Sequence, residues 1–171
     1  MAISETIYYN SPIGPLQIKN NEDAICELSF IKTIRHTKID EAEIELSTAS
    51  SPVLIKCITQ LNDYFSGKNL QFNLPLLQPG TSFQQTVWTA LQNIAHGKTL
   101  SYLQLSKNLG NTKAIRAVGT ANGKNNIAII VPCHRVIGSN GSLVGYAGDL
   151  WRKKWLLAHE AKYCNGVQTL F

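Results

Sequence analysis

The chain has 171 residues, of which 44% are hydrophobic and 16% are charged, and its formal net charge is +5. This length suits one domain or two small ones, and the composition is that of a soluble globular protein. No apolar run approaches the roughly 20 residues that a membrane-spanning helix needs, so we exclude an integral membrane protein.

The N-terminus and the cysteines indicate a reducing compartment. Residues 1–5 form neither a basic leader nor an apolar segment, so no secretory signal is expected. The four cysteines lack Cys-x-x-Cys spacing, which argues against both a disulfide framework and a zinc knuckle. We therefore predict a cytoplasmic protein that holds no metal.

The charge is divided unevenly along the chain. Residues 1–80 carry six Lys/Arg against nine Asp/Glu, a formal charge of −3. Residues 81–171 carry ten Lys/Arg against two Asp/Glu, a formal charge of +8. Because the basic residues of this half are hardly interspersed with acidic ones, they predict a polyanionic partner. Nucleic acid is the first candidate and an anionic membrane surface the second.

The start of the chain predicts a small antiparallel sheet. Three segments have the alternating apolar pattern of half-buried strands, and turn residues at 11–15 and 20–23 separate them. The strands are expected at residues 6–9, 16–19 and 24–31.

A helix and two irregular segments complete this half. Residues 32–51 mix charges with scattered apolar positions and are expected to form a loop. Pro52 begins a helix that ends at Gly67, and residues 70–80 are expected to be an extended linker. The apolar face of the helix is expected to consist of Leu54, Ile55, Ile58, Leu61, Tyr64 and Phe65.

The second half is expected to be mostly helical. Thr81 or Ser82 caps a helix that stops near Gly97, and an amphipathic helix covers residues 150–162. Between them, a helix over residues 102–109, a glycine turn and a second helix capped by Thr112 have the helix-turn-helix pattern. Any corner between two helices gives similar spacing, so the positive charge of this half is the additional support for DNA binding.

The most informative stretch is residues 132–136, which read PCHRV. The apolar run 127–131 predicts a buried strand, and Pro132 ends it, so Cys133 is presented at a turn. A thiol with a pKa of about 8.5 needs a base or a positive neighbour to become a nucleophile, and His134 suits that role through a turn or a water. The alternative is a cysteine that merely packs under the end of a strand.

Several motifs in order resemble one family. They are Ser101-Tyr102, RAVG at 116–119, Asn125, IVPCHRV at 130–136, GYAG at 145–148 and WLLAHE at 155–160. With them the chain resembles the alkylguanine-DNA alkyltransferases, also called methylated-DNA–protein-cysteine methyltransferases. The resemblance covers nearly the whole chain and is strongest from residue 83 to residue 160.

The resemblance implies a mixed α/β (α+β) protein with two domains. Residues 1–78 would form an N-terminal α/β domain with a three-stranded antiparallel sheet and a ribonuclease H-like fold. Residues 79–171 would form a mostly helical domain with a winged helix-turn-helix that binds DNA and transfers the alkyl group.

The resemblance also implies a role for each matched residue. In catalysis, Cys133 would be the nucleophile, His134 its base through a water, Glu160 the group that orients His134, Tyr102 a donor to the leaving base and Asn125 the tie to the recognition helix. DNA contacts would come from Arg116, Lys113, Thr112, Ala117, Arg135 and Ser101, with Arg116 inserted into the base stack. The alkyl pocket would consist of Val136, Gly145, Tyr146, Ala147 and Gly148.

The implied activity is DNA repair by direct reversal of damage. The alkyl group of O6-alkylguanine, and also that of O4-methylthymine, would move once and irreversibly to Cys133 after the base is flipped out. The partner would be double-stranded DNA that contains alkylated guanine, bound by a monomer without any cofactor. Two departures are Ala147, where some members have serine, and Asn126, where many have proline.

Two other functions compete with this one. A non-enzymatic helix-turn-helix regulator that only binds DNA would not need Cys133, His134 and Glu160. A cysteine hydrolase would use these three residues, but it would not need a half-chain with a charge of +8.

Overall fold

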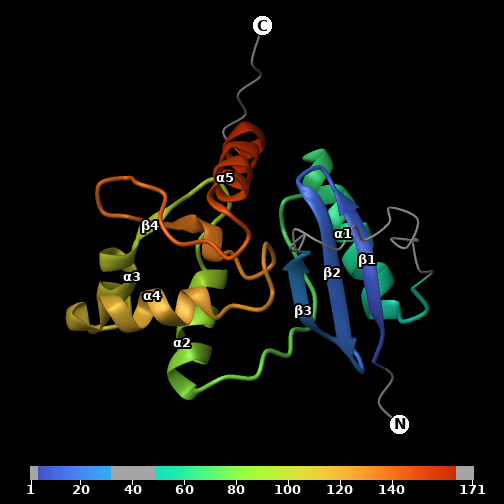
Figure 1. Cartoon of the computed structure of the whole chain (residues 1–171), viewed down its shortest axis with the longest axis horizontal. Helices are drawn as coiled ribbons and strands as arrows, with labels where there is room; N and C mark the ends of the chain where they lie inside the picture. Colours follow the sequence, from blue (N-terminus) through green and yellow to red (C-terminus); the bar gives the residue numbers. More distant parts are fainter. Residues whose placement is uncertain (1–3, 32–48, 165–171) are drawn as a thin grey trace, which may run out of the picture. The chain divides into compact units, whose positions relative to one another are not determined.

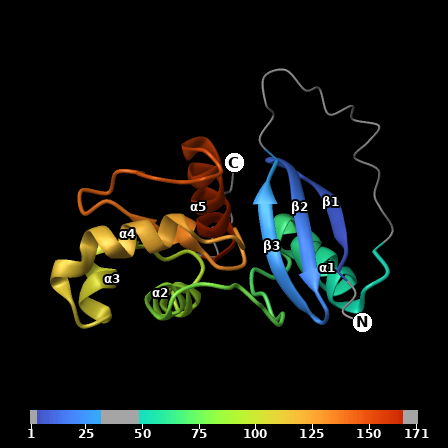
Figure 2. The ribbon, with the colours of Figure 1, turned by 60° about the horizontal axis from the view of Figure 1, so that its bottom comes forward.

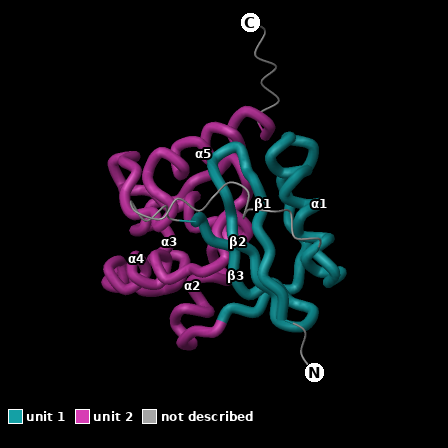
Figure 3. Tube along the Cα trace, turned by 45° about the vertical axis from the view of Figure 1, so that its right-hand side comes forward, with its two compact units in different colours: residues 1–78 teal, residues 79–171 magenta. Residues whose placement is uncertain are grey.

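The structure is a computed structural model that describes residues 4–31 and 49–164. The chain divides into two compact units, Met1–Gln78 and Pro79–Phe171, which Figure 3 shows in separate colours. Most of the loop expected at residues 32–51 lies outside the described residues.

Unit 1 contains the predicted antiparallel sheet. Its strands are β1 (Thr6–Ser11), β2 (Gly14–Asn21) and β3 (Ala24–Phe30), in that order across the sheet (Figure 1). All three predicted strands are confirmed, although β1 and β2 extend further than the sequence indicated. Ile18 of β2 lies opposite both Ile7 and Leu28, and all three side chains are buried.

Helix α1 (Pro52–Ser66) lies against one face of this sheet (Figure 2). Gly67 ends it in the left-handed conformation with φ 76°, as its position after the last apolar residue predicts. The predicted apolar face is partly wrong, because Ile55 is 50% exposed while Cys57 is fully buried. The buried stripe follows helical spacing and therefore excludes Ile55; it consists of Val53, Leu54, Cys57, Leu61 and Tyr64.

The segment predicted to be a free linker is partly attached to the sheet. Pro75 O accepts the amide of Ile25 at 2.9 Å, and the amide of Leu77 donates to Ile25 O at 2.9 Å. Leu76 thereby forms a parallel bridge with β3. The prediction of an extended backbone holds, but the edge of β3 offers unpaired backbone groups that this segment satisfies.

Unit 2 is built around helices α2 (Ser82–Gln92), α3 (Tyr102–Asn108), α4 (Ile115–Gly123) and α5 (Leu150–Cys164). Helix α4 packs on both α2 and α3, and the buried Trp88 of α2 donates from its indole to Ala121 O at 2.9 Å. None of the helices in the described part of the chain has the length and apolar character needed to span a membrane.

The predicted helix-turn-helix is present as α3, a turn and α4. The N-terminal cap of the segment that leads into the second helix differs from the prediction. The side chain of Asn111, and not that of Thr112, accepts the Lys113 amide at 3.0 Å. A 3-10 turn, η1 (Thr112–Ala114), then precedes α4. Both residue types cap helices well, and the fold decides between these adjacent candidates.

The apolar run before Cys133 is buried, but it is not the predicted strand. Ile129 has φ 69°, and across it the Ile130 amide donates to Ala128 O at 2.7 Å, which makes a γ-turn. A second γ-turn, of the inverse kind, surrounds Pro132 (φ −83°, ψ 63°), where the Cys133 amide donates to Val131 O at 2.8 Å. A run of apolar residues indicates burial, and here the buried segment satisfies its backbone by local turns. A β-branched residue at positive φ is strained, so neighbouring structure must hold Ile129 in place.

Two very short strands bring the helix-turn-helix close to Cys133. Leu100 of β4 (Leu100–Ser101) pairs in parallel with Val136 of β5 (Val136–Ile137). Because α3 begins directly after β4 and Cys133 lies three residues before Val136, this pairing places the start of α3 beside the PCHRV turn. Two-residue strands leave no periodic pattern in a sequence, and the sequence analysis missed them.

The corrected face of α1 gives a first prediction. Leu61→Ala should lower the free energy of unfolding by about 2–5 kcal/mol, because it leaves a cavity in a fully buried site. Ile55→Ala on the same helix should change it by no more than about 0.5 kcal/mol. Urea unfolding followed by circular dichroism measures both, and equal losses would contradict the buried face described here.

Candidate active site

Cys133 begins the 3-10 turn η2 (Cys133–Arg135) and is only 7% exposed. Burial raises the pKa of its thiol, while the side chain of Asn125 and the positive charge of Lys153 act in the opposite direction. Burial dominates, so the thiol is protonated at neutral pH and needs a base before it can act as a nucleophile.

His134 is fully buried and is placed as such a base. Its Nε2 lies 2.7 Å from Glu160 Oε1, so the contact implied by the resemblance is present. Burial opposes ionisation of Glu160, but hydrogen bonds from His134 and Arg135 outweigh it and hold the pKa of this carboxyl far below its usual range. An ionised carboxylate only accepts hydrogen bonds, so Nε2 carries the hydrogen and Nδ1 carries the lone pair.

The second nitrogen of the imidazole is available. His134 Nδ1 is buried and has no hydrogen-bond partner among the described residues. Burial also lowers the pKa of His134, which keeps the ring neutral at neutral pH. The site therefore holds a neutral imidazole whose free acceptor can take a proton.

Arg135 lies inside the protein, a position that does not support the expected contact with DNA, and that contact stays a prediction. The residue is 6% exposed in the structure, and Nε and Nη2 donate to Glu160 Oε2 and Oε1, both at 2.9 Å. Its Nη1 donates to the carbonyl oxygen of Ile94, just beyond α2. The sequence shows the charge of Arg135 but not the direction in which the 3-10 turn points it.

Asn125 connects α4 to the turn that carries Cys133. Its Nδ2 donates to Val131 O at 2.8 Å, and its Oδ1 accepts the Ile127 amide at 3.1 Å. These contacts hold both ends of the irregular segment before Pro132. Asn125 lies two residues after the end of α4, so the position of that helix and the position of Cys133 depend on each other.

Tyr102 and the loop at residues 144–148 lie on the other side of the site. The Tyr102 hydroxyl donates to Val144 O at 3.3 Å, and burial raises the pKa of this phenol, so it keeps its proton at neutral pH. Gly145 has φ 58°, and a Cβ there would lie 3.8 Å from the Tyr102 hydroxyl. Of the other expected pocket residues, Val136 and Gly148 are buried, Tyr146 is half-buried and Ala147 is exposed.

Lys153 is a site residue that the sequence analysis missed. It lies on α5, is fully buried, and donates from Nζ to Val136 O at 2.6 Å and Val144 O at 2.9 Å. It therefore ties the strand that follows Cys133 to the loop that meets Tyr102. Burial lowers its pKa, and the charge of Cys133 acts against that shift. The sequence does contain one indication of this position: Lys153 lies seven residues before Glu160, a spacing that puts both side chains on one face of the helix.

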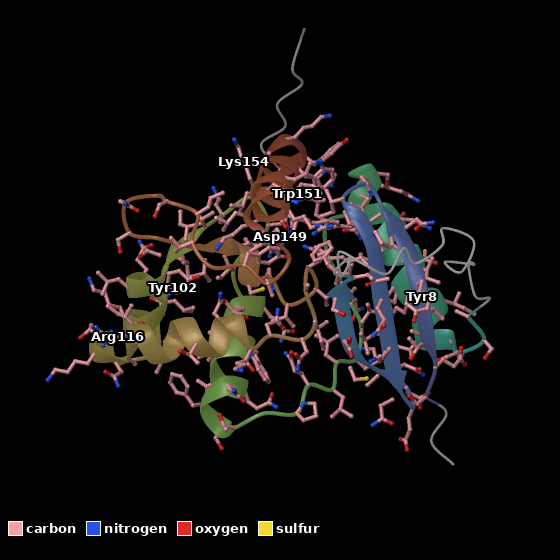
Figure 4. All side chains as sticks on the ribbon, viewed as in Figure 1. Tyr8, Tyr102, Arg116, Asp149, Trp151 and Lys154 are labelled. Carbon is pink, nitrogen blue, oxygen red and sulfur yellow. The ribbon has the colours of Figure 1, made fainter. Side chains whose placement is uncertain are left out.

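The residues expected to meet DNA lie mostly on the surface. Thr112, Lys113, Arg116 and Ala117 are exposed, on η1 and the first turn of α4. Figure 4 shows Arg116 on α4 and Tyr102 at the start of α3. Ser101 is half-buried and serves as a helix cap, because its hydroxyl oxygen accepts the Gln104 amide at 3.0 Å.

The other thiols have different surroundings from Cys133. Burial raises the pKa of Cys57 to about 12, and it also raises the pKa values of Cys26 and Cys164. Over residues 4–31 and 49–164, no three His, Cys, Asp or Glu side chains lie close enough together to hold a metal ion.

Comparisons with known proteins agree on one family. The family model described as the 6-O-methylguanine DNA methyltransferase DNA-binding domain matches residues 82–162, and the ribonuclease-like domain of the same methyltransferases matches residues 6–78. A methylated-DNA–protein-cysteine methyltransferase of Methanosarcina acetivorans is 42% identical over 152 residues, which are 89% of this chain and 95% of that protein. The constitutive enzyme of that name in Bacillus subtilis is 43% identical over 145 residues, or 83% of this chain and 87% of that protein.

Solved structures show the same relationship. The O6-methylguanine methyltransferase of Mycobacterium tuberculosis has a TM-score of 0.79 at 39% identity and covers 94% of both chains. A structure of Mycobacterium tuberculosis OGT in complex with DNA has a TM-score of 0.80 at 40% identity, covering 92% of this chain and 93% of that one.

The buried carboxylate gives a prediction about acid stability. Because the folded state lowers the pKa of Glu160, this group stabilises the fold above its unfolded pKa of about 4.3, and the stabilisation is lost as the pH falls below that value. Glu160→Gln should cost about 3–5 kcal/mol at pH 7, where it breaks a buried ionic network. The difference between the two proteins should shrink as the pH is lowered from 5 to 3.

Urea unfolding at several pH values measures this difference. Glu22→Gln, at an exposed turn of unit 1, is the matched control and should show a small difference at every pH. A Glu160→Gln difference that stays constant from pH 7 to pH 3 would contradict the assignment of the ionised carboxylate.

Proposed function

The chain belongs to the 6-O-methylguanine DNA methyltransferase family, and we propose that it repairs DNA by moving the alkyl group of O6-alkylguanine to its own Cys133. The observation that carries the assignment of residues is the line of contacts from Glu160 to His134, next to Cys133 on one turn. This arrangement of carboxylate, imidazole and thiol supplies the base that the buried thiol of Cys133 needs to lose its proton.

The chemistry follows from the protonation states of the site. His134 Nδ1 takes the proton of the Cys133 thiol through a water, and the imidazolium that forms is stabilised by Glu160. The thiolate then attacks the alkyl carbon, the carbon–oxygen bond breaks, and its electron pair passes to the guanine. The phenol of Tyr102, which stays protonated at neutral pH, donates a hydrogen bond to the departing base.

The reaction ends with a spent protein. The product at Cys133 is a thioether, which is not a leaving group at neutral pH, so each molecule acts once. The damaged DNA supplies the alkyl group, and the step consumes no cofactor. O4-methylthymine carries its methyl group on an equivalent exocyclic oxygen, and the proposal includes it as a second substrate. All four thiols are free, which fits a protein that acts in the cytoplasm.

Double-stranded DNA is the proposed partner, bound by residues 79–171 of a single chain. The reactive oxygen lies inside the duplex, so the nucleotide must be flipped out at a cost of a few kcal/mol. Arg116 is exposed on the second helix of the helix-turn-helix, where it can fill the space that the base leaves. Lys113 adds positive charge beside it, and the Mycobacterium tuberculosis relative solved with DNA supports this partner.

The competing functions explain fewer of these observations. A helix-turn-helix regulator has no use for a neutral imidazole held beside a buried thiol. A cysteine hydrolase would turn over many times, so a count of product molecules per protein molecule separates it from the proposed enzyme.

Substitution of the nucleophile tests the proposal directly. Wild-type protein incubated with DNA that contains O6-methylguanine should gain the mass of one methyl group on Cys133, and no more with excess DNA. Cys133→Ala should gain none, yet bind the same DNA with nearly unchanged affinity, because the thiol contributes chemistry rather than contact area. Peptide mass spectrometry and a gel-shift titration provide the two measurements. Removal of the methyl group from DNA by Cys133→Ala would refute the assignment.

Arg116→Ala should separate binding from flipping. We expect the transfer rate on duplex DNA to fall by about 10- to 1000-fold, since the flipped state loses the group that fills the gap. The rate on free O6-methylguanine base should hardly change. Single-turnover kinetics on both substrates measure this, and an equal loss on both would assign Arg116 to chemistry or folding.

Lys113→Ala is the matched control on the same surface. It should weaken duplex binding and flatten the salt dependence by about 0.9 in the slope of log K against log salt, while transfer from bound DNA stays near the wild-type rate.

A further inference from the structure

We propose that Arg135 is a positioning residue that keeps His134 a neutral base: it holds both carboxylate oxygens of Glu160 and balances the charge of this group. This inference rests on the proposed function, and it gives a catalytic purpose to a residue that the sequence had suggested for DNA binding.

The clamp is a two-point contact in a buried site. Nε of Arg135 donates to Glu160 Oε2 and Nη2 donates to Oε1, each at 2.9 Å, so the guanidinium and the carboxylate meet side by side. Oε1 is also the atom that accepts from His134 Nε2 at 2.7 Å. A bidentate pair fixes the plane of the carboxylate, and the carboxylate in turn fixes the direction of the imidazole.

Two further contacts anchor the clamp to the rest of unit 2. The remaining guanidinium group, Nη1, donates to Ile94 O beyond α2, and the Gly97 amide donates to Glu160 Oε2 at 3.3 Å. The carboxylate is thus held by η2 and by the segment after α2, although it belongs to α5. A lysine in place of Arg135 has a single charged nitrogen and cannot make this fork.

The charge of Arg135 acts together with burial to keep His134 neutral. A buried Glu160 alone would draw a proton onto the imidazole, since the ion pair would then be neutral. Arg135 already neutralises the negative charge of the Glu160 carboxylate. An imidazolium at His134 would therefore leave a net positive charge in a buried site. In accord with this, burial lowers the pKa of His134 most, Glu160 raises it, and Arg135 adds to the lowering.

Other titratable groups also face the cluster. From α5, Lys153 acts on His134 in the same direction as Arg135, and Cys164 interacts with both Glu160 and Arg135. From the loops, Tyr146 lies near enough for the charge of Glu160 to raise its pKa, and the charge of Lys98 lowers the pKa of Cys164. The side chains of Arg135 and His134 both contact the Glu160 carboxylate, and Arg135 brings the opposite charge, so its removal tests the effect of that charge.

The test is the pH dependence of methyl transfer from free O6-methylguanine base, which avoids DNA binding. In Arg135→Met the acid limb of the pH–rate profile should move to higher pH by about one unit or more. The transfer rate at a pH below the limb should then be about tenfold lower than that of the wild type, and the wild-type rate should return at high pH. Arg135→Lys keeps the charge and loses the fork, so its acid limb should stay near that of the wild type while its plateau rate falls. Lys19→Met, which removes a surface ion pair of 2.9 Å in unit 1, is the control and should match the wild type.

A second readout does not depend on the activity. Nitrogen-15 NMR of the His134 ring at pH 7 should show a neutral imidazole protonated at Nε2 in the wild type and an imidazolium in Arg135→Met. If Arg135→Met does not fold, the double variant Arg135→Met/Glu160→Gln removes both charges together. That double variant should keep a neutral ring at pH 7 and lose rate uniformly across the profile.

The outcomes separate this inference from the proposed function. A wild-type protein that never methylates Cys133 overturns the function, whatever the NMR shows. A wild-type protein that transfers methyl groups, with Arg135 variants that lose rate equally at every pH and keep a neutral ring, overturns the role of Arg135. An acid limb that moves equally in Arg135→Lys and Arg135→Met overturns the charge argument.

Discussion

The buried carboxylate of Glu160 is the constraint on which the site of unit 2 depends. A carboxylate removed from water must be surrounded by donors, and this one receives hydrogen bonds from His134, Arg135 and the amide of Gly97. These donors come from the turn that follows Pro132 and from the segment that follows α2. Because the carboxylate is ionised, the imidazole has one possible tautomer, and the nitrogen that faces away from Glu160 becomes the acceptor. The stability of this unit and the chemistry at Cys133 thus rest on the same ion.

Regular secondary structure stops just before Cys133, the proposed nucleophile. Two γ-turns precede Cys133, one of them with a β-branched residue at φ 69°. Such a backbone persists only when its surroundings hold it, and Asn125 does so through hydrogen bonds to Ile127 and Val131. Lys153 provides a similar tie on the far side of the turn, between β5 and the loop at residues 144–148. A rigid turn of this kind is suited to hold a thiol at a fixed distance from an incoming base.

Recognition and chemistry are linked through α4. This helix begins beside the exposed Arg116 and ends two residues before Asn125. On the proposed function, a DNA contact at the first turn of α4 is therefore connected through one helix to the turn that carries Cys133. The short pairing of β4 with β5 makes a second connection, because it sets Tyr102 at the start of α3 against the loop after Cys133.

The sequence by itself determined the elements and residue types that follow local rules. Alternation in the first three strands, helical spacing in the long helices, and the cap residue Thr81 depend on neighbours within a few positions, so their pattern is readable. The PCHRV motif with its companion residues likewise indicated a nucleophile and its base. Tertiary structure decided what depends on distant partners. It turned Arg135 inward, buried Lys153, made residues 127–131 a series of turns, and attached residues 75–77 to β3. A charged side chain has the same sequence signature whether it meets water or a buried carboxylate 25 residues away, as Arg135 does, and only the fold brings that partner into reach.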